Sequence, residues 1–324
     1  MAHGATSPAR GSARRRRAPF PGAGIWDLRA LFAEGRAWVD AALAASPQLD
    51  PGARAELLTA SAATALWSGG HDEATALARQ GLALFRDAGD EEGMARATLL
   101  LGHAALHRGD HVEAGELLDH SRAEFARLDQ PWNEATALGR LGCLLRARGD
   151  YGRSQTRFEE AVALHRDLGD ERGIAWISWQ LGVLAYRQAD PTRATRHCQE
   201  SLELHERLGS AYGVAHVRST LGALAADRDD TTEATRLYEA SLSALRDLGD
   251  RQCVAAASSS LATVALRSGH PDRAEALLTE SIAVRRQIGD QTGVAECRKR
   301  LEAISRSPRA APAPARTRRP ASAR

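Results

Sequence analysis

Aromatic residues are scarce in this chain of 324 residues. Phe, Trp and Tyr together make up 5% of the sequence, whereas hydrophobic residues of all kinds make up 43%. The core must therefore consist mainly of Leu, Ala and Val. Small and aliphatic side chains suit the close packing of helix on helix better than the two packed sheets of a β-sandwich. The composition thus favours an all-α fold.

Cysteine and long hydrophobic runs are also lacking. No run of about 18 apolar residues exists, so no membrane-spanning helix is predicted. The basic N-terminus has no apolar stretch typical of a secretory signal. The four cysteines follow no CxxC or other metal-ligand spacing, as expected for reduced thiols in a cytosol; they are Cys143, Cys198, Cys253 and Cys297. We expect a cytoplasmic protein that makes no contact with a membrane.

Charge is unevenly distributed, although the net charge is only +2. Residues 1–24 contain five arginines and no acid, and residues 306–324 contain six arginines and no acid. The rest of the chain contains 32 basic and 41 acidic residues, so the body between the two ends carries a net charge near −9. Both ends are rich in Ala, Pro, Ser and Arg, a composition that buries too little surface to fold. We predict two disordered tails, a basic one over 1–24 and an Arg/Pro/Ala one over 306–324.

Signatures of catalysis are absent as well. The sequence has no GxxxxGK[ST] phosphate loop, no HExxH and no GxSxG. His103 and His107 are four residues apart and His111 follows, a spacing that would suit zinc if further ligands were in step. None accompanies them, so polar groups on an open groove are the simpler interpretation. We predict no enzyme activity, no cofactor and no metal site.

A period of 40 residues runs through the sequence. One column contains glycine except at Asp129: Gly89, Gly169, Gly209, Gly249 and Gly289. A second column contains leucine followed by glycine, or once by alanine: Leu101, Leu141, Leu181, Leu221 and Leu261. A third contains alanine alone: Ala95, Ala135, Ala175, Ala215, Ala255 and Ala295. So many coincidences at one period indicate a repeat protein.

Each period divides into two helical halves. The first, for example 92–108, carries Leu-Gly near its middle. The second, for example 111–127, runs from a small residue to a large one and back to a small one, as in Ala234, Tyr238 and Ser241. Small side chains at fixed positions let helix backbones approach closely, and the large one fills the gap beside them.

The joints between halves carry helix-end signals. The phrase RDLGD occurs at 166–170 and again at 246–250, where the glycine would end one helix and the aspartate would cap the next. Other glycines suited to a left-handed helix end are Gly109, Gly149 and Gly269. Other predicted N-caps are Asp110, Asp150, Asp190 and Asp230, while Pro191 and Pro271 fall in the first helical turn.

This pattern resembles the tetratricopeptide repeat (TPR), whose helix pairs carry Leu-Gly in the first helix and Ala, an aromatic and Ala in the second. The resemblance covers residues 25–305. The repeat also resembles the TPR sensor arms of bacterial, actinobacterial-looking STAND ATPases and LuxR- or MalT-type regulators, without their ATPase or DNA-binding domains. The resemblance implies a right-handed TPR superhelix, an all-α solenoid of about six 40-residue helix-turn-helix repeats plus terminal helices.

In TPR proteins the first helices line a concave groove. Counting from the Leu-Gly glycine of each repeat places a cluster of aromatic residues and two arginines in that groove. Three of the ten Trp and Tyr residues fall in a single repeat. The predicted partner-binding residues are Trp176, Trp179, Tyr186, Arg187, Arg146, His103 and His107. Aromatics beside arginine are typical of binding hot spots, but wide aromatic rings also pack between neighbouring helices, and the pattern leaves both interpretations open.

The predicted function is binding, as a protein-interaction or ligand-sensing scaffold in a cytoplasmic regulatory system, with a peptide or protein segment in the concave groove. The alternative is a nucleic-acid-associated protein or peptide-responsive transcriptional regulator that uses its arginine-rich tails. No DNA-binding element accompanies those tails. Because Lys299 is the single lysine, arginine is simply the usual cation of this chain. Solvated tails are therefore favoured over nucleic-acid binding.

Overall fold

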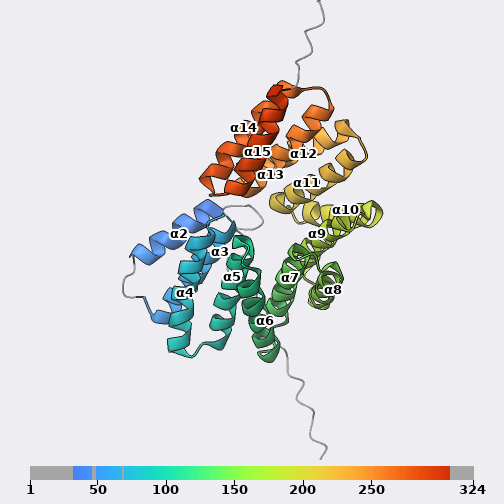
Figure 1. Ribbon diagram of the computed structural model, residues 1–324. Coiled ribbons are helices and arrows are strands. Elements are labelled where there is room, and N and C mark those ends of the chain that lie inside the picture. Colours follow the sequence, from blue (N-terminus) through green and yellow to red (C-terminus); the bar gives the residue numbers. More distant parts are fainter. Residues whose placement is uncertain (1–31, 46–48, 68, 307–324) are drawn as a thin grey trace, which may run out of the picture.

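Every regular element in the described part of the chain is an α-helix. The computed structural model describes residues 32–45, 49–67 and 69–306, so the two predicted tails lie outside it except for Arg306, and so do residues 25–31. Figure 1 shows the fourteen helices of these ranges following one another along a curved array. Their bounds are α2 Phe32–Ala45, α3 Pro51–Trp67, α4 His71–Ala88, α5 Glu91–Arg108, α6 His111–Arg127, α7 Pro131–Ala147, α8 Tyr151–Asp167, α9 Glu171–Arg187, α10 Pro191–Arg207, α11 Ala211–Asp227, α12 Thr231–Asp247, α13 Arg251–Arg267, α14 Pro271–Gln287 and α15 Gln291–Arg306.

Six helix pairs make up the array, as the period of 40 residues predicts. α3 packs on α4, α5 on α6, α7 on α8, α9 on α10, α11 on α12 and α13 on α14. α2 precedes the first pair and α15 closes the last. The prediction of an all-α solenoid of about six repeats with terminal helices is confirmed.

The first helices of the pairs gather on one side of the array. Each contacts the first helix of the next pair directly, from α3 and α5 through to α11 and α13. The second helices meet the following pair through its first helix, as α4 meets α5 and α6 meets α7. The first helices therefore lie on the inside of the curve. We call the face that α3, α5, α7, α9, α11 and α13 present there the inner surface.

The joints between helices follow the sequence signals. Asp110, Asp150, Asp190 and Asp230 each accept a hydrogen bond from the backbone amide three residues further on, at 2.9 to 3.2 Å. The glycines predicted to end helices have the left-handed backbone that favours glycine, with φ of 65° to 81°. Asp129 takes the same conformation, with φ of 53°, in the column where other repeats have glycine.

The two RDLGD joints differ from one another. Asp250 caps α13 by accepting from the amide of Cys253 at 2.9 Å. At the equivalent position, the carboxylate of Asp170 accepts from the indole Nε1 of Trp132 at 2.8 Å and lies 2.9 Å from Nδ1 of His165. Asp170 therefore joins α7, α8 and the start of α9.

The small-residue columns lie where helices approach most closely. A Cβ added to Gly142 would lie 2.5 Å from the Phe158 ring, and one added to Gly222 would lie 3.2 Å from the Tyr238 ring. A buried serine in the second helix donates to an alanine carbonyl of the first helix in four pairs, at 2.7 to 2.9 Å. The predicted close packing of the two helices in each pair is therefore confirmed.

None of the helices within 32–45, 49–67 and 69–306 is both long enough and apolar enough to cross a bilayer.

Candidate partner-binding surface

Polar side chains link the first helices of consecutive pairs along the inner surface. The links are Arg146 (α7) to Gln180 (α9), Trp179 (α9) to Thr220 (α11), His216 (α11) to Asp250 before α13, and Ser259 (α13) to Arg300 (α15). Each joins residues 34 to 41 positions apart in the sequence, about one repeat. Two of the predicted site residues, Arg146 and Trp179, belong to this series.

Trp176 lies between α7 and α9. The guanidinium carbon of Arg140 lies 4.6 Å from the centre of a Trp176 ring, within the range of a cation–π contact. The indole also fills the space above Gly139, where an added Cβ would lie 2.5 Å from it. Trp176 is half-buried as a result.

Trp179 lies between α9 and α11. Its indole Nε1 donates to Oγ1 of Thr220 at 3.0 Å, and its ring centre lies 4.9 Å from that of His216. Both tryptophans therefore pack between neighbouring first helices, one of the two interpretations that the sequence left open. Both are also only half-buried, so part of each indole is exposed to solvent.

Tyr186, Arg187 and Arg146 surround these indoles with polar groups. The hydroxyl of Tyr186 faces the carboxylate of Asp227, and burial together with this contact raises the pKa of the tyrosine. Arg187 is exposed. Arg146 is half-buried, and its Nη1 donates to Oε1 of Gln180 at 2.5 Å. Of the two arginines predicted to receive a partner, Arg146 thus already binds its own chain.

The histidines of α5 form a separate cluster. Nε2 of His103 and Nε2 of His107 are 3.1 Å apart, and the ring of His71 stacks on that of His107 with centres 4.8 Å apart. The third histidine of the cluster is therefore His71, the first residue of α4, and not His111. Burial, aided by the charges of Arg140 and the other two histidines, lowers the pKa of His103 well below 6.5. His103 is buried, while His107 is partly exposed.

Sequence reasoning missed one group of chemically competent residues. His216, Asp250 and Cys253 meet between α11 and α13, and they are the one group of three or more potential metal ligands within the described ranges. Their sequence separation, 34 and 37 residues from His216, hides them from any search for local motifs.

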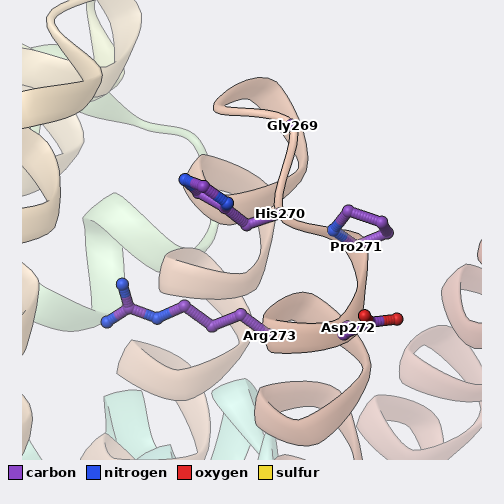
Figure 2. A pocket seen from close by; sticks show the side chains of 5 residues that line it. All are labelled: Gly269, His270, Pro271, Asp272 and Arg273. Carbon is purple, nitrogen blue, oxygen red and sulfur yellow. The ribbon is translucent and has the colours of Figure 1, made fainter. Parts of the chain in front are cut away.

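A shallow depression lies away from the inner surface, at the turn between α13 and α14. Its lining comes entirely from residues 269–273 of that one turn. Figure 2 shows His270 and Arg273 extending to one side of the turn, with Pro271 and Asp272 on the other. Arg273 forms an ion pair with Glu239 of α12. No convergent set of polar groups is present there, and we assign this depression no function.

The repeat pattern matches a known family model. The model, described as tetratricopeptide repeat, matches residues 93–167, 173–247 and 213–287, more than half of the chain. The chain belongs to the tetratricopeptide repeat family. None of the curated proteins matches it in sequence.

Several solved TPR structures share the fold. The Rap conjugation gene regulator of plasmid pLS20, in complex with the Phr* peptide, aligns with a TM-score of 0.67 at 13% identity, over 83% of this chain and 73% of that one. A Rap protein complexed with Competence and Sporulation Factor aligns with a TM-score of 0.61 at 14% identity, over 87% and 76%. A STAND protein with a TPR sensor from Pyrococcus horikoshii aligns with a TM-score of 0.55 at 12% identity, over 78% and 38%. At these identities the similarity shows the fold alone.

Proposed function

We propose that this TPR protein binds a peptide or protein segment along its inner surface, as a scaffold or sensor in a cytoplasmic regulatory system. The observation that supports this most directly is the clustering of half-buried Trp176, Trp179 and Tyr186 on one stretch of α9. Aromatic side chains that are held rigidly and remain partly exposed gain most from desolvation by a partner. The resemblance to the sensor arms of STAND and LuxR- or MalT-type regulators, and the Phr* peptide and Competence and Sporulation Factor bound in the two Rap structures, support the same function.

The chemistry of the surface favours an extended peptide rich in acceptors. Exposed Arg187 lies one residue beyond Tyr186 and offers a guanidinium to a carboxylate or a backbone carbonyl. The body of the chain is acidic, with a net charge near −9, so overall charge would repel an acidic partner. Local arginine contacts would therefore decide which acidic groups are accepted. The same net charge disfavours a nucleic acid on this surface.

We propose binding rather than catalysis as the role of these residues. The aromatic groups contribute apolar area and hydrogen bonds, and the Tyr186 hydroxyl, which faces Asp227, has a raised pKa that disfavours a nucleophilic phenolate. The inner links hold α7, α9 and α11 at a fixed spacing, which preorganises the surface for a partner.

The test is capture of a partner by the full chain and by single variants. Immobilised wild-type protein would be incubated with cell lysate, the retained protein identified, and its affinity then measured by calorimetry. Trp179→Ala and Tyr186→Ala should each weaken binding about fivefold or more, equivalent to about 1 kcal/mol, the threshold of a hot spot. Trp38→Ala is the matched control, because Trp38 is an exposed indole on α2 with 65% of its surface accessible.

Loss of structure must be separated from loss of binding. Trp179→Phe keeps a ring in place but removes the donor to Thr220, so it should fold and bind with intermediate affinity. If Trp179→Ala and Tyr186→Ala unfold the array by circular dichroism, these residues are packing elements and the proposal fails. Equal affinity of wild type and both variants would also refute it.

A further inference from the structure

Three metal-ligating side chains meet where α11 faces the start of α13. One ring nitrogen of His216, one carboxylate oxygen of Asp250 and the sulfur of Cys253 all lie within 4.8 Å of one another. His216 Nε2 is 3.4 Å from Asp250 Oδ2, and His216 Nδ1 is 3.8 Å from Cys253 Sγ. Tetrahedral zinc, with bonds of about 2.0 to 2.3 Å, keeps its ligand atoms roughly 3.5 Å apart. Nε2 faces the carboxylate and Nδ1 faces the sulfur, so only one of the two ring nitrogens can bind a shared ion. Small side-chain rotations would close the span of up to 4.8 Å between the three ligand atoms to that spacing.

The cluster is buried and incompletely satisfied by the protein itself. His216 and Asp250 are each only 7% exposed. Nε2 of His216 is buried and has no hydrogen-bond partner of acceptable geometry. Asp250 uses Oδ1 to cap α13, which directs Oδ2 toward the imidazole. A buried carboxylate and an unsatisfied ring nitrogen are both unfavourable, and a divalent cation between them would satisfy both.

Aromatic side chains hold the imidazole in place. The ring centre of His216 lies 4.9 Å from that of Trp179 and 4.2 Å from that of Tyr212. Trp179 is itself fixed by its hydrogen bond to Thr220. A ligand histidine whose ring orientation is fixed by its neighbours binds a metal more tightly than a freely rotating one.

The repeat provides an internal comparison for these residue types. Cys253 stands in a column that four of the other repeats fill with glycine, at Gly93, Gly173, Gly213 and Gly293, and one with asparagine, at Asn133. One period earlier the same three positions are Trp176, Ser210 and Gly213, and one period later they are Ala256, Asp290 and Gly293. The solenoid therefore forms without this combination. Packing alone does not explain why a histidine, a carboxylate and a thiol coincide at a single pair of repeats.

We propose that His216, Asp250 and Cys253 form a binding site for a zinc-class divalent cation, with the fourth coordination position open to water or to a donor from outside the chain. A donor set of nitrogen, oxygen and sulfur suits Zn²⁺, whereas Mg²⁺ and Ca²⁺ require oxygen ligands. On binding, the Cys253 thiol releases its proton to solvent and the sulfur bonds to the metal. The site does not depend on the proposed peptide binding.

A thiol nucleophile is the competing role for the same residues. In such a site His216 would accept the proton of Cys253 and Asp250 would orient the imidazole. Burial, together with the nearby Asp250 carboxylate, raises the pKa of the Cys253 thiol well above its ordinary value. A nucleophile and a metal ligand both require the thiolate. A divalent cation supplies the positive charge that deprotonates the thiol on binding, whereas the His216 imidazole would have to do so beside the Asp250 carboxylate.

The test is titration of the metal-free full chain with Co²⁺, followed by competition with Zn²⁺. One equivalent of Co²⁺ should produce visible bands of tetrahedral intensity and a near-ultraviolet sulfur-to-cobalt charge-transfer band, and Zn²⁺ should abolish both. Cys253→Ser should remove the charge-transfer band. His216→Ala and Asp250→Asn should weaken binding tenfold or more. Asn is chosen because it is as good an N-cap as Asp, so α13 keeps its capped start.

Matched controls come from elsewhere on the inner surface. Cys143→Ser removes a half-buried thiol on α7, and His107→Gln removes one member of the α5 histidine cluster. Both should bind Co²⁺ like the wild type. The proposal is overturned if no stoichiometric binding occurs, if the charge-transfer band survives in Cys253→Ser, or if His107→Gln abolishes binding. Circular dichroism of each variant establishes that it is folded before its titration is interpreted.

Discussion

Gly182 lies so close to Cys198 that no side chain fits between them, because a Cβ on Gly182 would lie 2.6 Å from the Cys198 sulfur. That Cβ would also lie 3.3 Å from the backbone oxygen of Ala194, which cannot easily move. From the sequence alone, Gly182→Ala is expected to have only a mild effect on stability. The structure instead predicts that the alanine methyl group would overpack the space between the two helices.

We expect a graded effect of alanine at the glycines of the first helices. At Gly142 the added Cβ would lie 2.5 Å from the Phe158 ring, and at Gly222 it would lie 3.2 Å from the Tyr238 ring. Overpacking costs about 1 to 3 kcal/mol, while replacing a helical glycine by alanine returns about 1 kcal/mol. Gly142→Ala should therefore lower the melting temperature clearly and Gly222→Ala only slightly. Equal effects would contradict the packing distances.

The equivalent substitution at Gly182 has a built-in test. Gly182→Ala should destabilise the array, and adding Cys198→Ala should recover part of the loss because it removes the clashing sulfur. Urea unfolding of the two single variants and the double variant measures this coupling. Simple additivity of the two effects would show that the sulfur is not the obstacle.

Asp170 should matter more to stability than an ordinary helix cap. Its carboxylate binds Trp132 and His165, whereas Asp230 accepts one backbone amide at an exposed position. Removing a shared, half-buried acceptor leaves donors unsatisfied, at about 1 to 3 kcal/mol, while loss of a single cap costs about 1 kcal/mol. Thermal melting should rank Asp170→Ala well below Asp230→Ala, and the reverse order would refute the role given to this joint.

The carboxylate of Asp170 should also make the stability of the fold depend on pH in the acid range. Burial tends to raise the pKa of Asp170, but its contacts with His165, the Gly173 amide and Trp132 outweigh burial and lower the pKa below 3.8. The folded state therefore holds the carboxylate charged more firmly than the unfolded state does. Its stabilisation is present above pH 4 and is lost as pH falls below that value. Asp170→Asn should show a shallower loss of melting temperature than wild type between pH 4.5 and about 3.

His103 should make the stability of the fold depend on pH in a higher range, near neutrality. Its pKa is lowered in the folded state by burial and by the charges of Arg140, His107 and His71. Below about pH 6.5 the unfolded chain gains a proton that the folded chain resists, so stability is present above 6.5 and declines as pH falls. His103→Gln cannot titrate and should show a weaker decline in melting temperature between pH 7.5 and 5. Identical slopes for variant and wild type would contradict this origin.

Ala189 is strained at the end of α9. Its φ is 56°, in a column where Gly109, Gly149 and Gly269 take the same left-handed conformation. An alanine in this conformation is about 1 kcal/mol less stable than glycine. Ala189→Gly should therefore raise the melting temperature, and the matched Gly149→Ala should lower it. A stabilising effect of the second substitution would show that the helix ends relax when the residue changes.

Much of the fold can be predicted from the sequence because a repeat compares the chain with itself. Asp129 is an example. It stands in a column that is otherwise glycine, so the column predicts a left-handed backbone at this residue, and the structure contains it. Cys198 occupies the column in which Tyr238 is the large residue of the second helix, and both are buried. The repeat columns therefore predict burial and backbone conformation within a single repeat well.

Contacts between repeats are less accessible from the sequence. The columns place Trp176 on the inner surface, but not the Arg140 guanidinium stacked on it or the space that Gly139 leaves. The spacing of His103 and His107 indicates a pair, but the third ring comes from His71, one helix earlier. These partners depend on how far one pair is rotated on the next, which no single repeat encodes.

The cluster of His216, Asp250 and Cys253 was missed for the same reason. Its members come from two repeats and match no local motif. One signal was available, since Cys253 replaces glycine in its column. In a repeat protein, a residue that departs from its column without a structural reason indicates a candidate functional position.

The direct contacts between first helices determine how the array can bend. Each first helix packs on both helices of the preceding pair, most extensively on the second, while among the described helices no comparable contact joins one second helix to the next. We therefore expect bending to take place about the first helices, with the second helices spreading or closing around them. A ligand lying along the first helices would encounter nearly constant spacing at every curvature. The array could thus change its curvature while the inner surface, which would contact a partner, keeps nearly the same length.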